Sequence, residues 1–453
     1  MVLDRQGSRG KKGYGRVGIF IFQAAVIVET AFTIFRIITK SNQQKARSLI
    51  RIAAFTIFLL LVAVQAIEWS LRYYALAALL LILAVIGVVD LILRKEEKRP
   101  YKAVHVSLKA IGMTVLVFAA TLPSIIFPQY NMVETSGEYP VATSAYTYTD
   151  TNRIETFTDT GEYRKLNVRM WYPENTQDTY PLIVFSHGGI SSKSSNESLY
   201  HELASNGYVV CSIDHTYHCL FTTDEDGHTT WIDDGYVHEL FVEDAESDRQ
   251  QSYEYYQKWM KIRTGDISFV IDHILQEAET NEADRVYALV NTAKIGVIGH
   301  SIGGSAALGI GRMRDDVSAV VALESPFMCD IKGVKGGEFV FVNEVYPVPV
   351  LNVYSDSSWS HLAEWPQYAE NHALLFDTDT IVFNVHISGV GHFSLTDLAL
   401  ASPLLTRIFN GQKSTTDPRY SLRTINKICL GFFNCYLKGK SEFTSDGHIR
   451  LPA

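Results

Sequence analysis

The chain of 453 residues exceeds the length of one typical domain, and its charge is divided unevenly. Residues up to Val133 hold 17 Lys and Arg against 6 Asp and Glu, whereas the remainder holds 23 against 43. Five cysteines exclude a disulfide-built scaffold, although one bridge stays possible, and the acidic remainder excludes a nucleic-acid surface. We therefore expect a basic front part and an acidic back part, with no nucleic-acid partner.

The basic front carries four long apolar stretches. Each is close to the roughly 20 residues that a helix needs to cross a hydrocarbon core. They run over 17–38, 50–69, 73–93 and 104–127. The first contains Glu29 and Arg36, so whether it crosses fully stays open. We expect residues 1–130 to form an N-terminal membrane domain, a bundle of about four transmembrane helices, with the lipid bilayer as partner.

Clusters of Lys and Arg predict how these stretches are oriented. One cluster lies over 40–51, before the second stretch, and another lies over 94–102, between the third and the fourth. Basic loops favour the cytoplasmic side, so the acidic part is expected outside the cytoplasm, at a plasma membrane. The basic arm over 5–16 disagrees, because it would also prefer the inside.

Residues 131–164 read as a polar connector with edge strands, and 165–453 read as the second domain. Short apolar or β-rich runs alternate there with helical candidates. The strands are expected over 166–172, 182–185, 208–213, 295–298, 319–323, 350–354 and 382–387, and the helices over 197–204, 265–277 and 302–312. The pattern predicts an α/β fold with a mostly parallel sheet and helices on both faces.

The segment Gly299-His300-Ser301-Ile302-Gly303-Gly304 lies between a predicted strand and a predicted helix. A nucleophilic serine needs such a sharp turn, because the turn lifts its hydroxyl off the sheet, and flanking glycines avoid clashes where backbones crowd. Ser301 is therefore the candidate nucleophile.

Partners for Ser301 are expected at the carboxyl ends of the strands. His392 follows the last predicted strand and is the candidate general base. Two carboxylates compete to orient it. Glu324 closes the strand after the nucleophile helix, and Asp356 closes the next strand. Both can reach a histidine in this architecture, so Asp356 stays the alternative acid.

Acyl transfer also requires donors for a developing oxyanion. The glycines of Phe185-Ser-His-Gly-Gly-Ile190 leave backbone N–H groups accessible after a predicted strand. We expect the N–H groups of Gly189 and Ile302 to form the oxyanion hole, and His187 to shape this loop rather than to move protons.

Residues from about Lys165 to Phe393 resemble the platelet-activating-factor acetylhydrolase and dienelactone-hydrolase-like branch of the α/β-hydrolases. The resemblance rests on five segments: Val168-Arg-Met-Trp-Tyr-Pro173, Val184-Phe-Ser-His-Gly188, Leu203-Ala-Ser-Asn-Gly-Tyr-Val-Val210, Gly299-His-Ser-Ile-Gly-Gly304 and the late His392. It implies an α/β-hydrolase fold and calcium-independent hydrolysis of esters, including short acyl groups on lipids. In the acetylhydrolases the acid stands where Glu324 lies, which favours Glu324, but those enzymes carry Asp there.

The segment 214–256 is longer than a simple strand-helix connection and is expected to form a cap. Cys211, His215, His218 and Cys219 lie in or near it, but their spacing fits no familiar zinc pattern. We expect no metal and no other cofactor.

These features together predict a membrane-anchored serine esterase that cleaves short-acyl or lipid-like esters through an acyl-enzyme. One alternative is the same site acting on peptides or lactones. Another is a degenerate hydrolase domain that serves as the binding module of a membrane sensor or channel. The sequence does not fix the oligomeric state.

Overall fold

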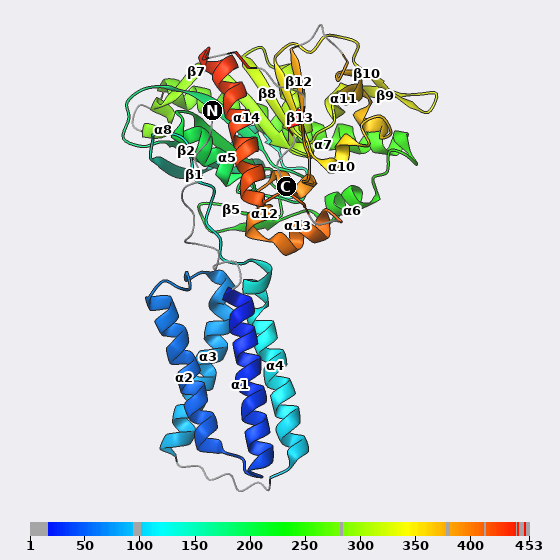
Figure 1. Ribbon diagram of the computed structural model, residues 1–453. Coiled ribbons are helices and arrows are strands. Elements are labelled where there is room, and N and C mark those ends of the chain that lie inside the picture. The colour runs from blue at the N-terminus through cyan, green and yellow to red at the C-terminus, as the bar shows by residue number, and fades with distance from the viewer. Residues whose placement is uncertain are drawn as a thin grey trace, which may run out of the picture. The chain divides into compact units, whose positions relative to one another are not determined.

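The computed structural model describes residues 17–93, 101–280, 284–376, 381–411, 414–440, 442–443 and 448–449 (Figure 1). The chain forms two compact units. One runs to Asn131 and includes Leu400–Leu405, and the other comprises Met132–Ala399 and the residues from Thr406 onward. The basic arm over 5–16 and most of the second basic cluster lie outside the described residues.

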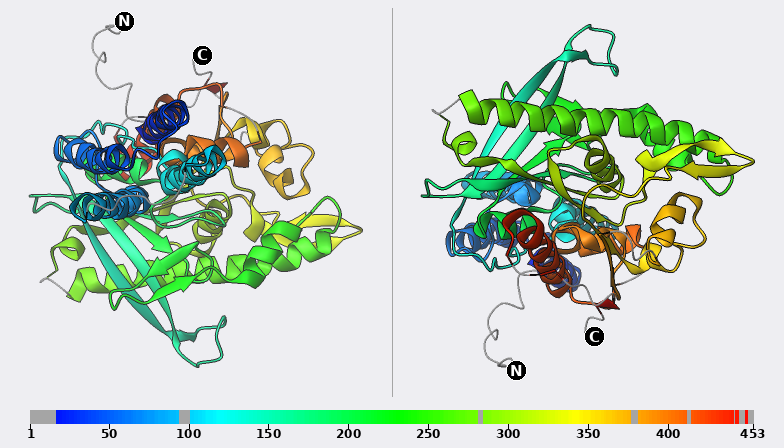
Figure 2. Two further views of the ribbon diagram at one scale, coloured as in Figure 1. Left: turned by 90° about the horizontal axis from the view of Figure 1, so that it is seen from below. Right: turned by 90° about the horizontal axis from the view of Figure 1, so that it is seen from above.

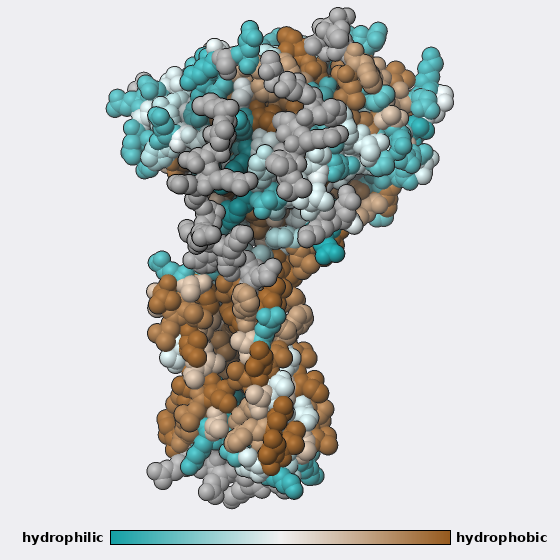
Figure 3. All heavy atoms as spheres, in the orientation of Figure 1, coloured by the Kyte–Doolittle hydropathy of each residue, from teal (hydrophilic) through white to brown (hydrophobic). Residues whose placement is uncertain are grey.

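The first unit is built from four long helices, as the sequence predicts. They are α1 (Val17–Ile38), α2 (Gln44–Ala63), α3 (Tyr74–Ile92, preceded by the 3₁₀ turn η2, Leu71–Tyr73) and α4 (Ala103–Ile126). All four are long and apolar enough to cross a membrane. Figure 3 shows their visible face covered mostly by apolar side chains.

The second helix differs from its predicted range of 50–69. It begins at Gln44 and ends at Ala63, and Gln65 takes a positive φ of 58°. The predicted range omits the start of the helix because Lys45 and Arg47 interrupt the apolar run there. It includes Ile67 and Trp69 because they are apolar, although the helix has already ended at Ala63. Helix bounds follow backbone hydrogen bonds, and polar residues satisfy those as well as apolar ones.

Close approaches between glycine and serine bring these helices together in pairs. A Cβ on Gly18 of α1 would lie 2.5 Å from the hydroxyl of Ser124 in α4. A Cβ on Gly87 of α3 would lie 2.8 Å from the carbonyl of Ser48 in α2. Small residues at such contacts let helix backbones approach closely.

Arg72 joins two connections at one end of the bundle. It lies just before α3 and donates to the carbonyl groups of Phe127 and Pro128, directly after α4. Because Gly18 of α1 also contacts the last turns of α4, the start of α1, the start of α3 and the end of α4 share this bundle end. The starts of α2 and α4 therefore share the other end.

A mostly parallel sheet forms the centre of the second unit, as predicted. Its nine described strands, in spatial order, are β1 (Val141–Ile154), β2 (Tyr163–Pro173), β4 (Val209–Asp214), β3 (Tyr180–Ser186), β7 (Val290–His300), β8 (Val317–Leu323), β11 (Val350–Tyr354), β12 (Val382–Ile387) and β13 (His448–Ile449). The pairs β1–β2 and β2–β4 are antiparallel, and the others are parallel. The carboxyl ends of β3, β7, β8, β11 and β12 thus meet at one edge.

Helices cover both faces of this sheet. Figure 2 shows α7 (Arg249–Thr280) on one face and α14 (Pro418–Lys438) on the other. Helix α9 (Ile302–Met313), which follows Ser301, packs with α7, and α5 (Glu197–Ser205) packs with α14. Every residue of β3 is buried between these layers.

Shorter elements complete the unit. The segment expected as a cap holds the hairpin β5 (Phe221–Thr223) and β6 (Thr229–Trp231), α6 (Asp234–Val242) and the first turns of α7. A second hairpin joins β9 (Ile331–Lys335) and β10 (Glu338–Phe341). The remaining elements are α8 (Arg285–Ala288), η3 (Met328–Asp330), α10 (Asp356–Trp359), η4 (Pro366–Tyr368), α11 (Ala369–Ala373), η5 (His392–Leu395), α12 (Leu398–Ala401) and α13 (Pro403–Phe409). All five cysteines lie in described segments, and none forms a disulfide.

Candidate active site

Ser301 lies on a strained turn between β7 and α9. Its φ of 55° and ψ of −130° are unfavourable for a residue with a side chain, and its N–H donates to the carbonyl of Leu323 at 2.9 Å. Crowding around the turn requires glycine. A Cβ on Gly299 would lie 2.3 Å from the backbone of Gly303, and one on Gly303 would lie 2.1 Å from the carbonyl oxygen of Ser186. The turn therefore has the geometry that exposes a nucleophilic hydroxyl.

Ser301, Glu324 and His392 line one cavity of about 310 Å³. They come from the carboxyl ends of β7 and β8 and from the loop after β12. The rest of its lining is mostly apolar and aromatic, and includes Leu240, Tyr256, Trp259, Ile302, Pro326, Met328, Trp365 and Tyr368. A reacting group bound here would lie against mostly apolar walls.

The imidazole of His392 faces the carboxylate of Glu324. Its Nδ1 lies 3.3 Å from Oε2 of Glu324, and its backbone N–H donates to Ser357 Oγ at 3.0 Å. Nε2 of His300 donates to the carbonyl of His392 at 3.2 Å. Burial lowers the pKa of His300 to about 3, so this neighbour stays neutral and adds no positive charge beside His392.

Glu324 is buried and rigidly held. Its φ is 53°, its N–H donates to the carbonyl of Val353 at 2.7 Å, and Tyr368 donates its hydroxyl to the Glu324 carbonyl at 3.2 Å. Ser355 donates to Oε1 at 2.8 Å. Burial alone would raise the pKa of Glu324, but the His392 imidazole and the Ser355 hydroxyl outweigh it and hold the pKa below its ordinary value. The side chain is therefore a carboxylate that can orient an imidazole.

Asp356, the alternative acid, lies against a different histidine. Its Oδ1 is 2.8 Å from Nε2 of His386, and its Oδ2 accepts the N–H of Gly389 at 2.8 Å. The structure thus brings Glu324, and not Asp356, to His392. Asp356 instead holds the start of the loop that carries His392.

The loop expected to supply oxyanion donors packs against the Ser301 turn. A Cβ on Gly188 would lie 3.6 Å from Cβ of Ser301, and one on Gly189 would lie 3.5 Å from Cδ1 of Ile302. Ile302 is the first residue of α9, so its N–H has no acceptor within the helix. Both expected donors therefore belong to backbone beside Ser301.

His187 is fully buried beneath this loop. Its Nδ1 lies 2.6 Å from the carbonyl of Gly188, and its Nε2 accepts the N–H of His215 at 3.4 Å. Burial, reinforced by the charge of Arg263, holds the pKa of His187 well below its ordinary value. A neutral imidazole with a hydrogen-bond partner at each nitrogen suits the loop-shaping role expected for His187.

The four residues weighed as metal ligands from the sequence divide among different partners. Cys211 lies within β4, Nδ1 of His215 lies 2.9 Å from Asp266, and His218 stacks on Tyr236 with ring centroids 3.7 Å apart.

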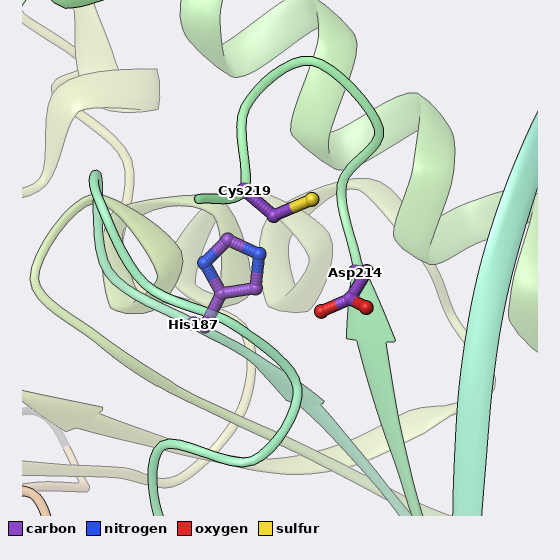
Figure 4. A group of neighbouring side chains, drawn as sticks. All are labelled: His187, Asp214 and Cys219. Atoms are coloured by element: carbon purple, nitrogen blue, oxygen red, sulfur yellow. The ribbon is translucent and has the colours of Figure 1, made fainter. Parts of the chain in front are cut away.

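A different group, His187, Asp214 and Cys219, has ligand atoms within 4.8 Å of one another (Figure 4). The Lys193 side chain pairs with Asp214, which also accepts the Lys193 N–H at 2.6 Å and the Thr222 hydroxyl at 2.7 Å. Burial raises the pKa of Cys219, so its thiol stays protonated. Lys193 thus supplies the positive charge that a cation would bring to this group.

Several supporting residues were not predicted from the sequence, among them Ser355 and Arg263. Ser355 donates a hydrogen bond to Glu324, and the only sequence feature that pointed to it was its position next to Asp356. Arg263, whose guanidinium reaches the carbonyls of His187 and Gly188, lies two residues before the predicted helix of 265–277, whereas the observed helix α7 begins at Arg249.

Curated proteins with similar sequences are acetylhydrolases. The platelet-activating factor acetylhydrolase of Gallus gallus is 22% identical over 286 residues, which cover 59% of this chain and 64% of that protein. Those of Cavia porcellus and Canis lupus familiaris are each 23% identical, covering 58% and 60% of this chain and 59% and 60% of the relatives. The chain thus spans about three fifths of the length of these relatives.

A solved structure shares the fold. The ferulic acid esterase from Streptomyces cinnamoneus superposes with a TM-score of 0.52 at 19% sequence identity, covering 68% of this chain and 93% of that one. The model of the family "Platelet-activating factor acetylhydrolase, isoform II" matches residues 138–449, more than half of the chain. The chain is therefore a member of the platelet-activating factor acetylhydrolase, isoform II, family, with an α/β-hydrolase fold.

Proposed function

We propose that the chain is a membrane-anchored serine esterase that cleaves short-acyl or lipid-like carboxylic esters. The observation that carries this proposal is that Ser301, on a strained turn, shares a cavity with His392, whose Nδ1 lies 3.3 Å from the buried Glu324 carboxylate. Membership of a family named for an ester hydrolase supports the same class of reaction.

The proposed reaction begins when Ser301 Oγ attacks the ester carbonyl and His392 takes its proton. Glu324 on Nδ1 leaves Nε2 of the imidazole for this transfer and stabilises the imidazolium that forms. The N–H groups of Gly189 and Ile302 bind the oxyanion. His392 then protonates the departing alkoxide, and water, activated by the same imidazole, releases the acid from Ser301.

The size of the cavity supports short acyl groups. Its volume of about 310 Å³ lies at the lower end of ordinary ligand pockets, and aromatic side chains line much of it. We expect acetyl and other short esters of p-nitrophenol to be cleaved faster than long-chain ones. A panel that includes an amide and a lactone would separate the esterase from an enzyme for peptides or lactones.

The Ser301→Ala variant tests the proposed nucleophile. We expect it to abolish both hydrolysis of p-nitrophenyl acetate and labelling by a fluorophosphonate probe, because the hydroxyl forms the acyl-enzyme. Ser194→Ala, at an exposed serine, serves as the matched control and should keep full activity. Unchanged turnover in Ser301→Ala would refute the assignment, and absence of probe labelling in the unaltered protein would favour a degenerate domain.

We also propose that the first unit spans a plasma membrane and that the hydrolase unit lies outside the cytoplasm. The starts of α2 and α4 share one bundle end, and the basic residues 40–51 and Lys102 lie at that end, which favours the cytoplasm for it. The hydrolase unit follows the other end of α4. The basic arm over 5–16 precedes α1 and opposes this orientation.

Single cysteines placed on either side test the orientation. With Cys329 and Cys435 replaced by serine, we expect Thr135→Cys to react with an impermeant maleimide in intact cells. Ser41→Cys, in the connection between α1 and α2, should react only after the cells are permeabilised. The opposite labelling pattern would reverse the topology.

A further inference from the structure

Two buried side chains hold the loop that is expected to supply the oxyanion donors (residues 185–190, the oxyanion loop): His187, whose Nδ1 lies 2.6 Å from the carbonyl of Gly188, and Arg263. Arg263 of α7 is completely buried. Its Nη1 donates to the carbonyl of His187 at 2.5 Å, and its Nη2 donates to the carbonyl of Gly188 at 3.2 Å. These are two successive carbonyl groups just before Gly189, the expected oxyanion donor.

The geometry of a peptide bond links this contact to the donor. The carbonyl of Gly188 and the N–H of Gly189 belong to one planar peptide unit, and in a trans peptide the two groups point in opposite directions. The described chain contains no cis peptide bond. Holding the Gly188 carbonyl towards α7 therefore aims the Gly189 N–H away from α7.

This peptide unit needs such an anchor because glycine stands on both of its sides. Glycine residues accept nearly any φ and ψ, so the Gly188–Gly189 peptide could rotate at little steric cost. Rotation would turn its carbonyl oxygen towards the place where negative charge develops. A charged guanidinium on the carbonyl makes that rotation costly, because hydrogen bonds from charged donors are stronger than neutral ones.

The guanidinium is itself fixed by further contacts. Nη2 also donates to the carbonyl of His218 and to the hydroxyl of Tyr236, both at 3.2 Å. Tyr236 lies in the first turn of α6, within the cap-like segment, and is fully buried. Arg263 therefore joins α7, the cap and the oxyanion loop through one group.

A second anchor holds the residue before the loop. Asp266 lies three residues after Arg263, on the same side of α7, and its Oδ2 lies 2.9 Å from Nδ1 of His215. Nε2 of His215 lies 2.8 Å from Oγ of Ser186, the last residue of β3. These three groups have the hydrogen-bond order of a catalytic triad, but all are completely buried. No substrate reaches them, so they fix the strand end.

We propose that Arg263 is a positioning residue for catalysis: it orients the Gly188–Gly189 peptide so that the Gly189 N–H faces the oxyanion. The inference rests on the proposed esterase function and deepens it. Arg263 acts through backbone carbonyl groups and does not touch the substrate. A lysine at this position keeps the charge but has no planar fork to bond two carbonyls at once.

The test compares Arg263→Lys with the unaltered full-length protein. We expect kcat for p-nitrophenyl acetate to fall about 10²-fold, similar to the loss of one oxyanion donor, while KM changes little. Active-site titration with a fluorophosphonate normalises the rates to folded enzyme. Arg249→Lys is the matched control, because it makes the same substitution on α7 at a partly exposed residue, and it should leave both constants unchanged.

A second readout distinguishes positioning from loss of structure. Replacing the carbonyl oxygen of an ester by sulfur makes the developing anion a poor fit to an oxyanion hole. The rate ratio between an ester and its thionoester should therefore be large in the unaltered enzyme and should shrink in Arg263→Lys. A purely structural arginine would lower both rates together and leave the ratio unchanged.

Tyr236→Phe decides the question if Arg263→Lys does not fold. It removes one hydrogen bond from the guanidinium but keeps the ring on His218, so a smaller loss of kcat in the same direction is expected. Unaltered kcat and ester-to-thionoester ratio in the folded variants overturn the inference. If Ser301→Ala itself remains active, the proposed esterase site is what fails.

Discussion

Glu324 and Asp356 illustrate how two similar carboxylates at neighbouring strand ends differ. Glu324 is buried, with its carboxylate turned to Nδ1 of His392, whereas Asp356 is bound to His386 and to the backbone of Gly389. The Glu324 backbone has a positive φ, so its Cα–Cβ bond points in a different direction from that of an ordinary strand residue.

Glu324→Gln should lower kcat by about 10³ to 10⁴-fold, because the amide no longer stabilises the imidazolium and favours the wrong tautomer. KM should change little. Asp356→Asn should stay within a few-fold of the unaltered enzyme, since its partner is His386. Steady-state kinetics on both variants checks this, and a larger loss in Asp356→Asn would make it the triad acid.

These residues differ in how well the sequence alone predicts them. Ser301 is found from a local pattern, because strand, turn glycines and helix are contiguous. The choice between Glu324 and Asp356 is not local, since it depends on which side chain turns towards a loop that begins dozens of residues later. Ser355 and Arg263 contribute hydrogen bonds to other elements and leave no periodic signal.

Among the elements, the turn that carries Ser301 has the closest backbone contacts around the candidate site. Helix α9 approaches β3 so closely that Gly303 touches the backbone of Ser186 and His187. Gly303 is thus required because α9 packs closely on the end of β3, rather than because the turn needs an unusual backbone conformation at this residue.

Gly303→Ala should destabilise the hydrolase unit by about 1 to 3 kcal/mol, because a Cβ 2.1 Å from a carbonyl oxygen forces the backbone apart. Thermal unfolding should shift down by about 5 °C. Gly333→Ala in β9 is the control, since nothing lies within 4 Å of a Cβ there. Equal melting temperatures for the two variants would contradict this account.

The strands inside the sheet were predicted better than the helices that cover it and the hairpins that border it. The seven predicted strands are all present, and all except β12, which is mostly half-buried, consist largely of buried residues. The hairpin of β9 and β10 and the start of α7 are mixed polar segments whose stability comes from tertiary contacts. The bounds of α2 were wrong because hydropathy locates apolar residues rather than helix ends.

At the scale of the whole molecule, the hydrolase unit buries several histidines in neutral form. Burial lowers the pKa of His215 to about 4 and that of His300 to about 3, and it holds those of His187 and His218 well below the ordinary value. The unfolded chain would protonate all four near pH 6.5.

Stability should therefore decrease as pH falls from about 6.5 towards 4, because the unfolded state binds more protons over this range. Asp397 acts in the opposite direction, since burial raises its pKa to about 6. Melting temperatures measured by scanning fluorimetry should fall with pH, and more steeply in Asp397→Asn. A melting temperature that rises on acidification would contradict the assignment of neutral histidines.

The positions of the apolar helices and of the site residues along the chain have a consequence for biogenesis. The chain is made from its N-terminus, and domains generally fold as units during or after synthesis. The four apolar helices are made before the hydrolase unit, whereas Gly189, Ser301, Glu324 and His392 are contributed by segments spread over more than half of the residues that follow the helices. Under the proposed function, a growing chain therefore holds its four apolar helices before the residues of the proposed site can meet, so an unfinished chain cannot hydrolyse an ester.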